Sequence, residues 1–151
     1  MKIMFICTGN ICRSAMAHRM LEKRAKEEKK NIEVYSCGVY AINGDVPTYE
    51  GIEVMKEYGI DLSKHRATNI RNSGIEDMDV ILCATNSHKN NVIAMYPKLK
   101  EKVFTMKEYA GYKEGLDIKD PWGYGIETYR MCASEIENCI NRIIRRNKWI
   151  Y

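Results

Sequence analysis

The sequence predicts an α/β fold in which helices cover both faces of a parallel sheet. Predicted strands alternate with predicted helices along the chain, and the strands are short apolar runs, as in a sheet that is buried on both sides. The chain has 151 residues, and two domains of half that length would each be small for an independent core. We therefore expect one domain over residues 1–151.

The first half of the chain contains two predicted strands, each followed by a helix. Residues 2–7 form an apolar run that leads into Thr8-Gly9-Asn10. From residue 14 to about residue 30 an apolar stripe lies opposite charged residues, which is typical of an amphipathic helix; the stripe consists of Met16, Ala17, Met20, Leu21 and Ala25. A second strand is expected at 32–36 and a second helix at 48–58, which Gly59 ends because glycine accepts the left-handed conformation.

The second half repeats this alternation. A third buried strand is expected at 80–84, followed by a helix at 86–96 that Pro97 stops. A fourth strand is expected at 103–105. The last helix, at 126–146, is expected to bury Tyr129, Ala133, Ile136, Ile140 and Ile143. Ligands of such sheets bind beyond the carboxyl ends of the strands, so we expect functional residues in the connections that follow residues 7, 84 and 105.

Composition and charge exclude several classes of protein. Hydrophobic residues make up 45% of the chain and charged residues 29%, which excludes a disordered tail or a fibrous repeat. The net charge of +4 is too small to indicate a nucleic acid or an anionic membrane as a partner. The longest apolar runs, at 3–7 and 80–84, fall far short of the roughly 20 residues of a membrane-spanning helix and are too short for a signal peptide. We expect a cytoplasmic monomer.

The six cysteines are expected to be free thiols, because cytosolic proteins keep their thiols reduced. No Cys-x-x-Cys pair occurs, and the three histidines do not have the spacing of a zinc finger. We therefore expect neither a metal nor another cofactor. Most of the cysteines are expected to be small core residues, with Cys7 as the exception.

Residues 7–14, with the sequence Cys-Thr-Gly-Asn-Ile-Cys-Arg-Ser, join the first strand to the first helix and predict a phosphate-binding loop. A tight loop between a strand and a helix N-terminus directs successive backbone N–H groups inward, which creates an anion cradle. Gly9 is expected to supply the freedom that the turn needs, and Arg13 to bind two phosphate oxygens with its planar guanidinium. The spacing of Cys7 and Arg13 alone is a weak signal, and chance is the alternative.

Cys7 is the candidate nucleophile. The inward N–H groups, the dipole of the following helix and Arg13 all favour the thiolate form of this cysteine. Ser14 is expected to cap the helix and to donate a hydrogen bond to the Cys7 sulfur. A thiolate beneath a bound phosphate attacks phosphorus, so the loop indicates phosphatase chemistry.

Asp120 is the candidate acid that protonates the leaving oxygen. It must hold its proton until substrate arrives, because a second negative charge would repel the phosphate. Pro121 favours an extended conformation of Asp120, and Trp122 and Tyr124 are expected to form one wall of a slot for a flat ring. An ordinary Asp-Pro turn with aromatic side chains in the core is the alternative.

The loop at 7–14, followed much later by Asp120-Pro121 and an aromatic residue, resembles the low-molecular-weight protein tyrosine phosphatases, and the resemblance extends from end to end. It implies a four-stranded parallel sheet flanked by helices on both faces and a metal-free mechanism with a cysteinyl-phosphate intermediate. It makes Cys7 the nucleophile, Arg13 the phosphate clamp, and Asp120 the general acid and then the base. The implied partners are a phosphorylated protein or peptide as substrate and inorganic phosphate as product and inhibitor.

The resemblance also assigns supporting residues. The loop residues that surround the phosphate are Thr8, Gly9, Asn10, Ile11, Cys12 and Ser14. Asn10 and Ser14 match, with Ser36 and His65, a network that holds the loop in a strained shape. Cys12 matches a second loop cysteine that forms a disulfide with Cys7 under oxidation. Tyr40 and Ile42 lie in a segment that varies with specificity and are expected at the rim of the substrate site.

Two of the departures from the family pattern bear on the surroundings of the site. Thr85 stands where many members carry Asp, so the surroundings of the loop are expected to be less acidic. Eukaryotic members have two adjacent tyrosines after Asp-Pro, whereas here Trp122 is followed by Gly123, so the wall for the substrate ring differs.

Other activities share this scaffold. Protein-arginine phosphatases have the same Cys-Thr-Gly-Asn start of the loop and a Thr at the position of Thr85, but also a Thr at the position of Ile11. Because Ile11 offers only an apolar side chain, we favour phosphotyrosine as the substrate and keep phosphoarginine as the alternative. Arsenate reductases need a further cysteine where this chain has Asn90. A phosphopeptide-binding module without turnover would not need both the thiol of Cys7 and the acid Asp120.

Overall fold

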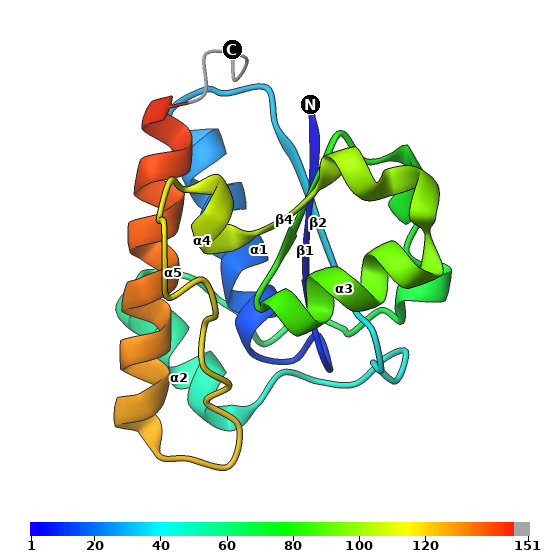
Figure 1. The fold of residues 1–151 in the computed structure, drawn as a ribbon. Helices are drawn as coiled ribbons and strands as arrows, with labels where there is room; N and C mark the ends of the chain where they lie inside the picture. Colours follow the sequence, from blue (N-terminus) through cyan, green and yellow to red (C-terminus); the bar gives the residue numbers. More distant parts are fainter. Residues whose placement is uncertain (147–151) are drawn as a thin grey trace.

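In the computed structural model, which describes residues 1–146, four parallel strands form a sheet in the order β2-β1-β3-β4 (Figure 1). β1 (Lys2–Cys7) pairs with β2 (Glu33–Gly38) on one side and with β3 (Val80–Cys83) on the other. β4 (Val103–Thr105) pairs with β3 at the far edge. The predicted fold class, a four-stranded parallel sheet with helices, is confirmed.

Within residues 1–146, five α-helices and three short 3₁₀ helices connect and cover the strands. The α-helices are α1 (Arg13–Glu27), α2 (Tyr49–Glu57), α3 (Asn86–Met95), α4 (Met106–Tyr109) and α5 (Ile126–Arg146). The 3₁₀ helices are η1 (Ile70–Asn72), η2 (Ile75–Asp77) and η3 (Pro97–Lys102). None of the helices within residues 1–146 is long and apolar enough to cross a membrane.

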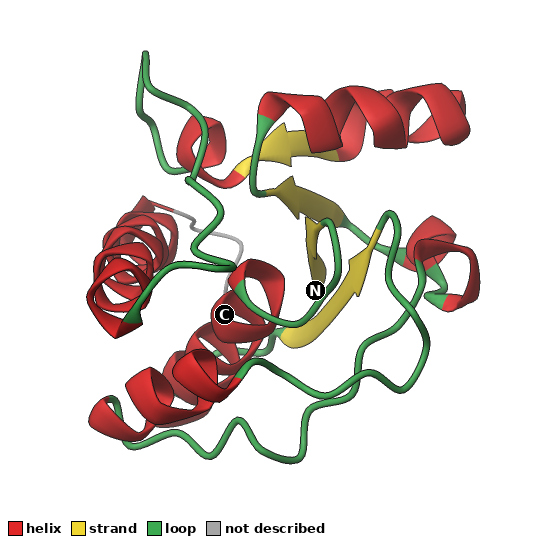
Figure 2. Cartoon of the chain, turned by 90° about the horizontal axis from the view of Figure 1, so that it is seen from below, coloured by secondary structure: helices red, strands yellow, loops and turns green. Residues whose placement is uncertain are grey.

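The central strand β1 sends alternate side chains into two separate cores. Ile3, Phe5 and Cys7 lie in the core that α1, α2 and α5 cover, and Met4 and Ile6 lie in the core on the side of α3. Figure 2 shows α1 and α5 on one side of the strands and α3 on the other. The alternation of side chains along β1 therefore places Cys7 at the end of the strand, directed to the α1 side, with 1% of its surface exposed.

Two element boundaries differ by two residues or more from the sequence-based expectation. α1 ends at Glu27, before residue 30, because Lys29 takes a left-handed conformation (φ 54°) and the N–H of Lys30 donates to the carbonyl of Ala25. β2 continues to Gly38, past residue 36, because Gly38 still pairs with Cys7 of β1. The end of the second helix is as expected, since Gly59 (φ 73°) follows α2 in the left-handed region.

Helix α4 was not expected from the sequence. It begins with a capping box, in which the Thr105 side chain accepts from the N–H of Glu108 and the Glu108 carboxylate accepts from the N–H of Thr105. Thr-x-x-Glu is the sequence signature of this motif. The helix has only four residues, so it carries no apolar stripe that periodicity could reveal.

The segment that follows β2 lies along the loop that follows β1. The N–H groups of Val39 and Tyr40 donate to the carbonyls of Cys7 and Thr8, at 3.0 and 2.9 Å. This close approach needs a glycine at residue 38. A Cβ atom at Gly38 would lie 2.5 Å from the carbonyl oxygen of Thr8 and 2.9 Å from the backbone nitrogen of Asn10. Both neighbours are backbone atoms, which cannot move aside cheaply.

We expect Gly38→Ala to lower the free energy of unfolding by roughly 1–3 kcal/mol, the usual cost of overpacking. Gly125→Ala is the matched control, because a Cβ at Gly125 meets nothing within 4 Å. Urea unfolding followed by circular dichroism measures both variants. Equal stability of the two variants would show that the approach of residue 38 to the loop is not tight.

Candidate active site

The loop after β1 turns its carbonyl groups outward, where other segments bind them. Besides the two bonds from Val39 and Tyr40, the N–H of Thr48 donates to the carbonyl of Ile11 at 3.1 Å. Nε2 of His65 lies 3.0 Å from the carbonyl oxygen of Asn10. The carbonyl of Cys12 accepts from the N–H of Met16 in the first turn of α1.

The N–H groups of the same loop are left without protein acceptors. Within residues 1–146, the N–H groups of residues 9–12 donate to no protein acceptor. The loop ends at the N-terminus of α1, where the helix dipole favours negative charge. Free N–H groups beside a helix N-terminus bind an oxyanion. The loop therefore has the geometry of the anion cradle that the sequence predicts.

Asn10 takes the left-handed conformation that the turn requires. Its φ is 57°, whereas Gly9 lies outside the left-handed region, so the expectation that Gly9 supplies the special conformation is wrong. Asn tolerates this conformation better than most residues, and here both ends of its side chain are bound. Its Oδ1 accepts from the N–H of Thr68 at 3.0 Å, and its Nδ2 donates to Oγ of Ser14 at 2.8 Å.

His65 contacts the loop at the backbone carbonyl of Asn10. A carbonyl oxygen only accepts, so Nε2 of His65 carries the proton in this contact and Nδ1 accepts from Arg19 at 3.1 Å. Burial lowers the pKa of His65 to about 4, the bond to Asn10 opposes this shift, and the neighbouring Arg19 adds to it. His65 is therefore neutral near pH 7 and links α1 to the loop.

Ser36 joins the network only through a histidine that the sequence analysis missed. Its Oγ lies 2.7 Å from Nδ1 of His18, and the ring of His18 packs edge-on against the ring of His65, with 5.9 Å between the centroids. Burial lowers the pKa of His18 to about 3, with smaller contributions from Arg19 and His65. Ser36 thus contacts His65 through His18, and within residues 1–146 its side chain makes no hydrogen bond to the loop itself.

Ser14 contacts the sulfur of Cys7 twice. Its Oγ lies 2.9 Å from Sγ, and its N–H donates to Sγ at 3.4 Å. The expectation that Ser14 caps the helix is wrong, because α1 begins at Arg13 and Cys12 occupies the capping position without a side-chain bond. Ser14 is instead inside the first turn, which leaves its hydroxyl group free to bind Cys7 and Asn10.

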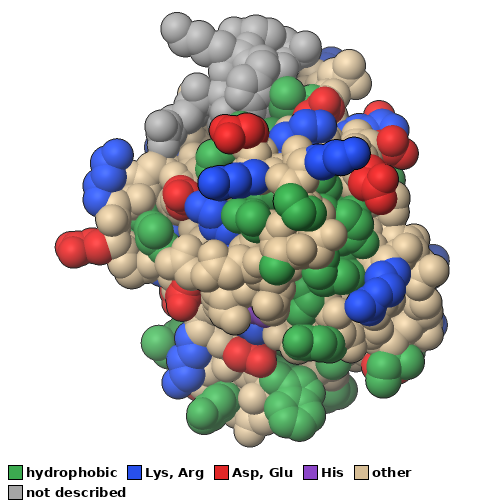
Figure 3. All heavy atoms as spheres, turned by 45° about the vertical axis from the view of Figure 1, so that its right-hand side comes forward, with side chains coloured by type: hydrophobic (Ala, Val, Ile, Leu, Met, Phe, Trp, Pro, Cys, Tyr) green, Lys and Arg blue, Asp and Glu red, His purple; other side chains and the backbone are tan. Residues whose placement is uncertain are grey.

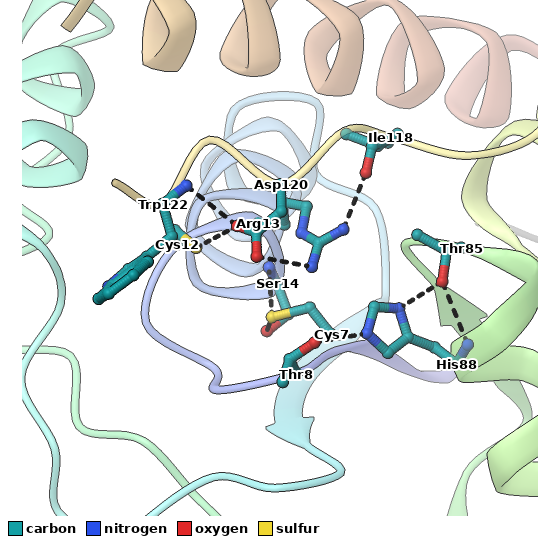
Figure 4. A network of polar contacts seen from close by, with 10 residues as sticks. All are labelled: Cys7, Thr8, Cys12, Arg13, Ser14, Thr85, His88, Ile118, Asp120 and Trp122. Atoms are coloured by element: carbon teal, nitrogen blue, oxygen red, sulfur yellow. Dashed lines mark hydrogen bonds and ion pairs between the residues drawn. The ribbon is translucent and has the colours of Figure 1, made fainter. Parts of the chain in front are cut away.

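Arg13 lies buried above the loop, and its buried Nε has no partner among residues 1–146. Nη1 donates to the carbonyl of Ile118 at 2.8 Å, and Nη2 lies 3.6 Å from Oδ2 of Asp120 (Figure 4). Its Nε is the one buried side-chain nitrogen or oxygen within residues 1–146 that has no hydrogen-bond partner. An orphaned buried donor is costly unless a ligand binds it, which supports an oxyanion site at this position.

Asp120 is held at the edge of the cradle by three groups. Besides the ion pair with Arg13, its Oδ1 accepts from the N–H of Trp122 at 3.0 Å and from the thiol of Cys12 at 3.7 Å. Half of the Asp120 side chain is exposed. Burial, with the nearby Cys7 and Asp120, raises the pKa of Cys12 far above its usual range, so Cys12 stays a thiol that donates to Asp120. Cys7 and Cys12 are not joined in a disulfide.

The aromatic residues expected at the substrate wall lie on the surface. Tyr40 is 74% exposed and Trp122 62%, and Tyr124 lies beneath the ammonium group of Lys119, 4.6 Å from its ring centroid. Ile42 is exposed as well. Figure 3 shows apolar side chains over the middle and the lower part of this face, and the loop after β1 lies in the lower half of the molecule in Figure 1. This arrangement suits a rim, and it excludes the alternative in which the aromatic residues of this turn fill the core.

His88, which no pattern in the sequence singled out, contacts the loop from α3. Its Nε2 lies 2.8 Å from Oγ1 of Thr8, and its Nδ1 lies 2.8 Å from Oγ1 of Thr85, the residue that caps α3. Burial lowers the pKa of His88 to about 4, and Arg13 contributes to this shift. The only sequence signal for these contacts was the place of Thr85 and His88 shortly after β3.

Within residues 1–146, no group of three His, Cys, Asp or Glu side chains has an arrangement that suits a metal ion.

We expect the protein to lose stability between pH 7 and pH 5. The three histidines, of which His65 and His88 are buried and His18 is partly buried, are neutral in the folded state, with pKa values of about 3 (His18) and about 4 (His65 and His88), whereas an unfolded histidine titrates at ~6.5. Unfolding therefore takes up protons below pH ~6.5, and the free energy of unfolding falls by roughly 1–2 kcal/mol for each histidine at pH 5. Urea unfolding at both pH values measures the loss.

The variant His18→Asn is the control for this prediction, because it removes one titrating group and keeps an amide donor near Ser36. Its loss of stability from pH 7 to pH 5 should be about a third smaller than that of the wild type. A free energy of unfolding that stays constant over this range would contradict buried, neutral histidines.

Comparison with known proteins agrees with this geometry. The family model "Low molecular weight phosphotyrosine protein phosphatase" matches residues 2–148. The chain is similar to a protein-arginine-phosphatase of Geobacillus stearothermophilus, with 36% identity over 96% of this chain and 95% of the relative. It is also similar to the crystal structure of a low-molecular-weight protein tyrosine phosphatase from T. tengcongensis, with a TM-score of 0.92, 38% identity and coverage of 97% and 99%.

A third similar protein is the YwlE arginine phosphatase, in a structure described as a cysteine-to-serine mutant with a phosphorylated active-site serine. Its TM-score is 0.90, with 31% identity over 98% of both chains. The family match over nearly the whole chain and relatives above 30% identity agree with the fold and with the loop. The chain therefore belongs to the low-molecular-weight phosphotyrosine protein phosphatases, a family of phosphatase enzymes.

Proposed function

We propose that the chain hydrolyses phosphotyrosine in proteins through a covalent phosphocysteine at Cys7. One observation carries the proposal: the sulfur of Cys7 lies beside the hydroxyl and N–H of Ser14, at the base of a loop in which the N–H groups of residues 9–12 have no acceptor within residues 1–146. Hydrogen bonds and positive potential of this kind stabilise a thiolate, which is the reactive form of cysteine.

In the first step the Cys7 thiolate attacks phosphorus. A sulfur–phosphorus bond forms, the bond from phosphorus to the tyrosine oxygen breaks, and Asp120 gives its proton to the leaving oxygen. The free N–H groups and the guanidinium of Arg13, with its unpaired Nε, bind the three phosphoryl oxygens. Bound phosphate would displace part of the contact between Arg13 and Asp120, which are 3.6 Å apart.

In the second step water hydrolyses the phosphocysteine. Asp120, now a carboxylate, takes a proton from the water as its oxygen attacks phosphorus, and the sulfur–phosphorus bond breaks to restore the thiolate and release phosphate. Asp120 is half exposed, so water reaches it. The similar YwlE structure with a phosphorylated active-site serine supports a phosphoenzyme on this scaffold.

The side chain of Ile11 supports phosphotyrosine as the substrate. Ile11 is partly exposed in the loop, and with the exposed rings of Tyr40, Trp122 and Tyr124 it offers apolar surface to an aromatic ring. Phosphoarginine is the second candidate. It is favoured by the similarity to the Geobacillus protein-arginine-phosphatase and by the carboxylate of Asp120, which suits a guanidinium group.

Further features complete the proposal. We infer one domain over residues 1–151, a monomer, a cytoplasmic location, and inorganic phosphate as product and inhibitor. The nucleophile, the acid and the phosphate clamp all come from side chains of the chain, so the proposed reaction uses no metal. Cys12 is the proposed partner of Cys7 in a protective disulfide, since both are free thiols on one short loop.

We expect Cys7→Ser to abolish release of phosphate from p-nitrophenyl phosphate, because a serine hydroxyl in this site is a far weaker nucleophile. Asp120→Asn should lower kcat about 10²–10⁴-fold on a substrate with a poor leaving group, the usual contribution of a general acid. Cys139→Ser, in a buried cysteine of α5, is the control and should keep its activity. Full turnover by Cys7→Ser would refute the covalent mechanism.

We expect phosphotyrosyl peptides to be hydrolysed with a higher kcat/KM than phosphoarginyl peptides of the same sequence. Ile11→Thr should shift this ratio toward phosphoarginine, because the hydroxyl group can orient water or the guanidinium-linked phosphate. Parallel assays of phosphate release from the two peptides measure the ratio. If the wild type prefers phosphoarginine, the role of Ile11 in specificity is contradicted. The proposed roles of Cys7 and the loop are not affected by that result.

A further inference from the structure

His88 is a buried histidine that the proposed mechanism does not use, although it contacts the residue next to the nucleophile. It is 6% exposed and lies in the first turn of α3. Figure 4 shows His88 and Thr85 on one side of Cys7 and Asp120 and Trp122 on the other. The contacts of His88 therefore reach the cradle from the wall opposite the proposed acid.

Three polar groups form a chain of hydrogen bonds that ends at the loop. Oγ1 of Thr85 lies 2.8 Å from Nδ1 of His88, and Nε2 of His88 lies 2.8 Å from Oγ1 of Thr8. Oγ1 of Thr85 also accepts from the backbone N–H of His88 at 3.1 Å. Thr85, which stands where many relatives were expected to carry Asp, is thus tied to His88.

The protons of this chain can be counted. A neutral imidazole has one N–H and each threonine has one O–H, so three protons serve the two contacts between the side chains. One hydroxyl proton must therefore point outward at one end of the chain. In the first arrangement, Thr85 donates to Nδ1 of His88, Nε2 of His88 donates to Thr8, and the Thr8 proton is free. In the second arrangement, Thr8 donates to Nε2, Nδ1 donates to Thr85, and the Thr85 proton is free.

An oxyanion in the cradle selects the first arrangement. Thr8 directly follows Cys7 and its side chain is exposed at the loop, so of the two ends of the chain it is the one next to the cradle, where an anion attracts a free hydroxyl proton. The Thr85 oxygen lies at the other end of the chain, at the N-terminus of α3, where it already accepts from the backbone N–H of His88 and where the nearest carboxylate, Asp117, accepts from the N–H of Asn86. Bound phosphate therefore favours His88 as the donor to Thr8.

We infer that Thr8 donates a hydrogen bond to the bound phosphoryl group and that His88 is the positioning residue that directs this proton into the cradle. This inference rests on the proposed function, and it adds one side-chain donor to the backbone N–H groups and Arg13. A donor aimed at a phosphoryl oxygen stabilises the negative charge of the transition state. His88 acts only through Thr8.

The test measures kcat and KM on p-nitrophenyl phosphate and the inhibition constant of inorganic phosphate. Thr8→Val removes the hydroxyl at nearly constant volume, and His88→Ala removes its support. Each should lower kcat/KM about 10-fold and weaken phosphate inhibition, the scale of one hydrogen bond to a charged group. Thr8→Ser and His88→Gln keep the hydroxyl and a donor near Nε2, so both should retain most of the wild-type activity.

The double variant Thr8→Val/His88→Ala separates positioning from a general structural effect. If His88 acts through Thr8, the double variant is no slower than either single variant. Thr128→Val, a Thr on α5, is the matched control for the loss of a hydroxyl, and thermal melts of all variants report folding.

Additive losses in the double variant, or wild-type phosphate inhibition in Thr8→Val, would overturn the inference while the proposed function stands. Loss of phosphate release in the wild type itself would instead overturn the proposed function. If Thr8→Ser loses as much activity as Thr8→Val, or His88→Gln as much as His88→Ala, the assigned roles are also contradicted, because Thr8→Ser and His88→Gln keep the hydrogen-bonding groups.

Discussion

The whole site depends on one constraint, the fixed outward direction of the carbonyl groups in the loop after β1. The carbonyls of Cys7 and Thr8 accept from the segment after β2, that of Ile11 from the N–H of Thr48, and that of Asn10 from His65. When carbonyls are bound on the outside of a tight curve, the N–H groups between them face its inside. Anion binding and the environment of the Cys7 sulfur both follow from this curvature.

The groups that impose this shape come from elsewhere in the fold. Gly38 lets the segment after β2 approach the loop, and the N–H of Thr68 binds the side chain of Asn10, the residue in the left-handed conformation. Arg19 of α1 orients His65, and His88 of α3 contacts Thr8. The site therefore depends on the packing of α1 and α3 against the sheet, because α3 carries His88 to the loop and α1 carries Arg19, the partner of His65.

Local patterns in the sequence predicted the strands, their order of appearance and the loop, because an apolar strand that runs into a phosphate-binding turn is a property of neighbouring residues. The contacts of the buried histidines could not be predicted in this way. Arg19 and His65 are 46 positions apart, and Thr8 and His88 are 80 apart. The choice of Asn10 over Gly9 for the left-handed position was equally hidden, since the bond from Thr68 joins residues 58 positions apart.

The central claim is that this cradle keeps the sulfur of Cys7 as a reactive anion beneath a bound oxyanion. The most direct test is the rate at which iodoacetamide alkylates Cys7 at pH 6, compared with a free thiol such as glutathione, with and without inorganic phosphate. The account predicts that Cys7 reacts much faster than the free thiol and that phosphate protects it. Alkylation as slow as that of the free thiol, or equally fast in the presence of phosphate, would contradict it.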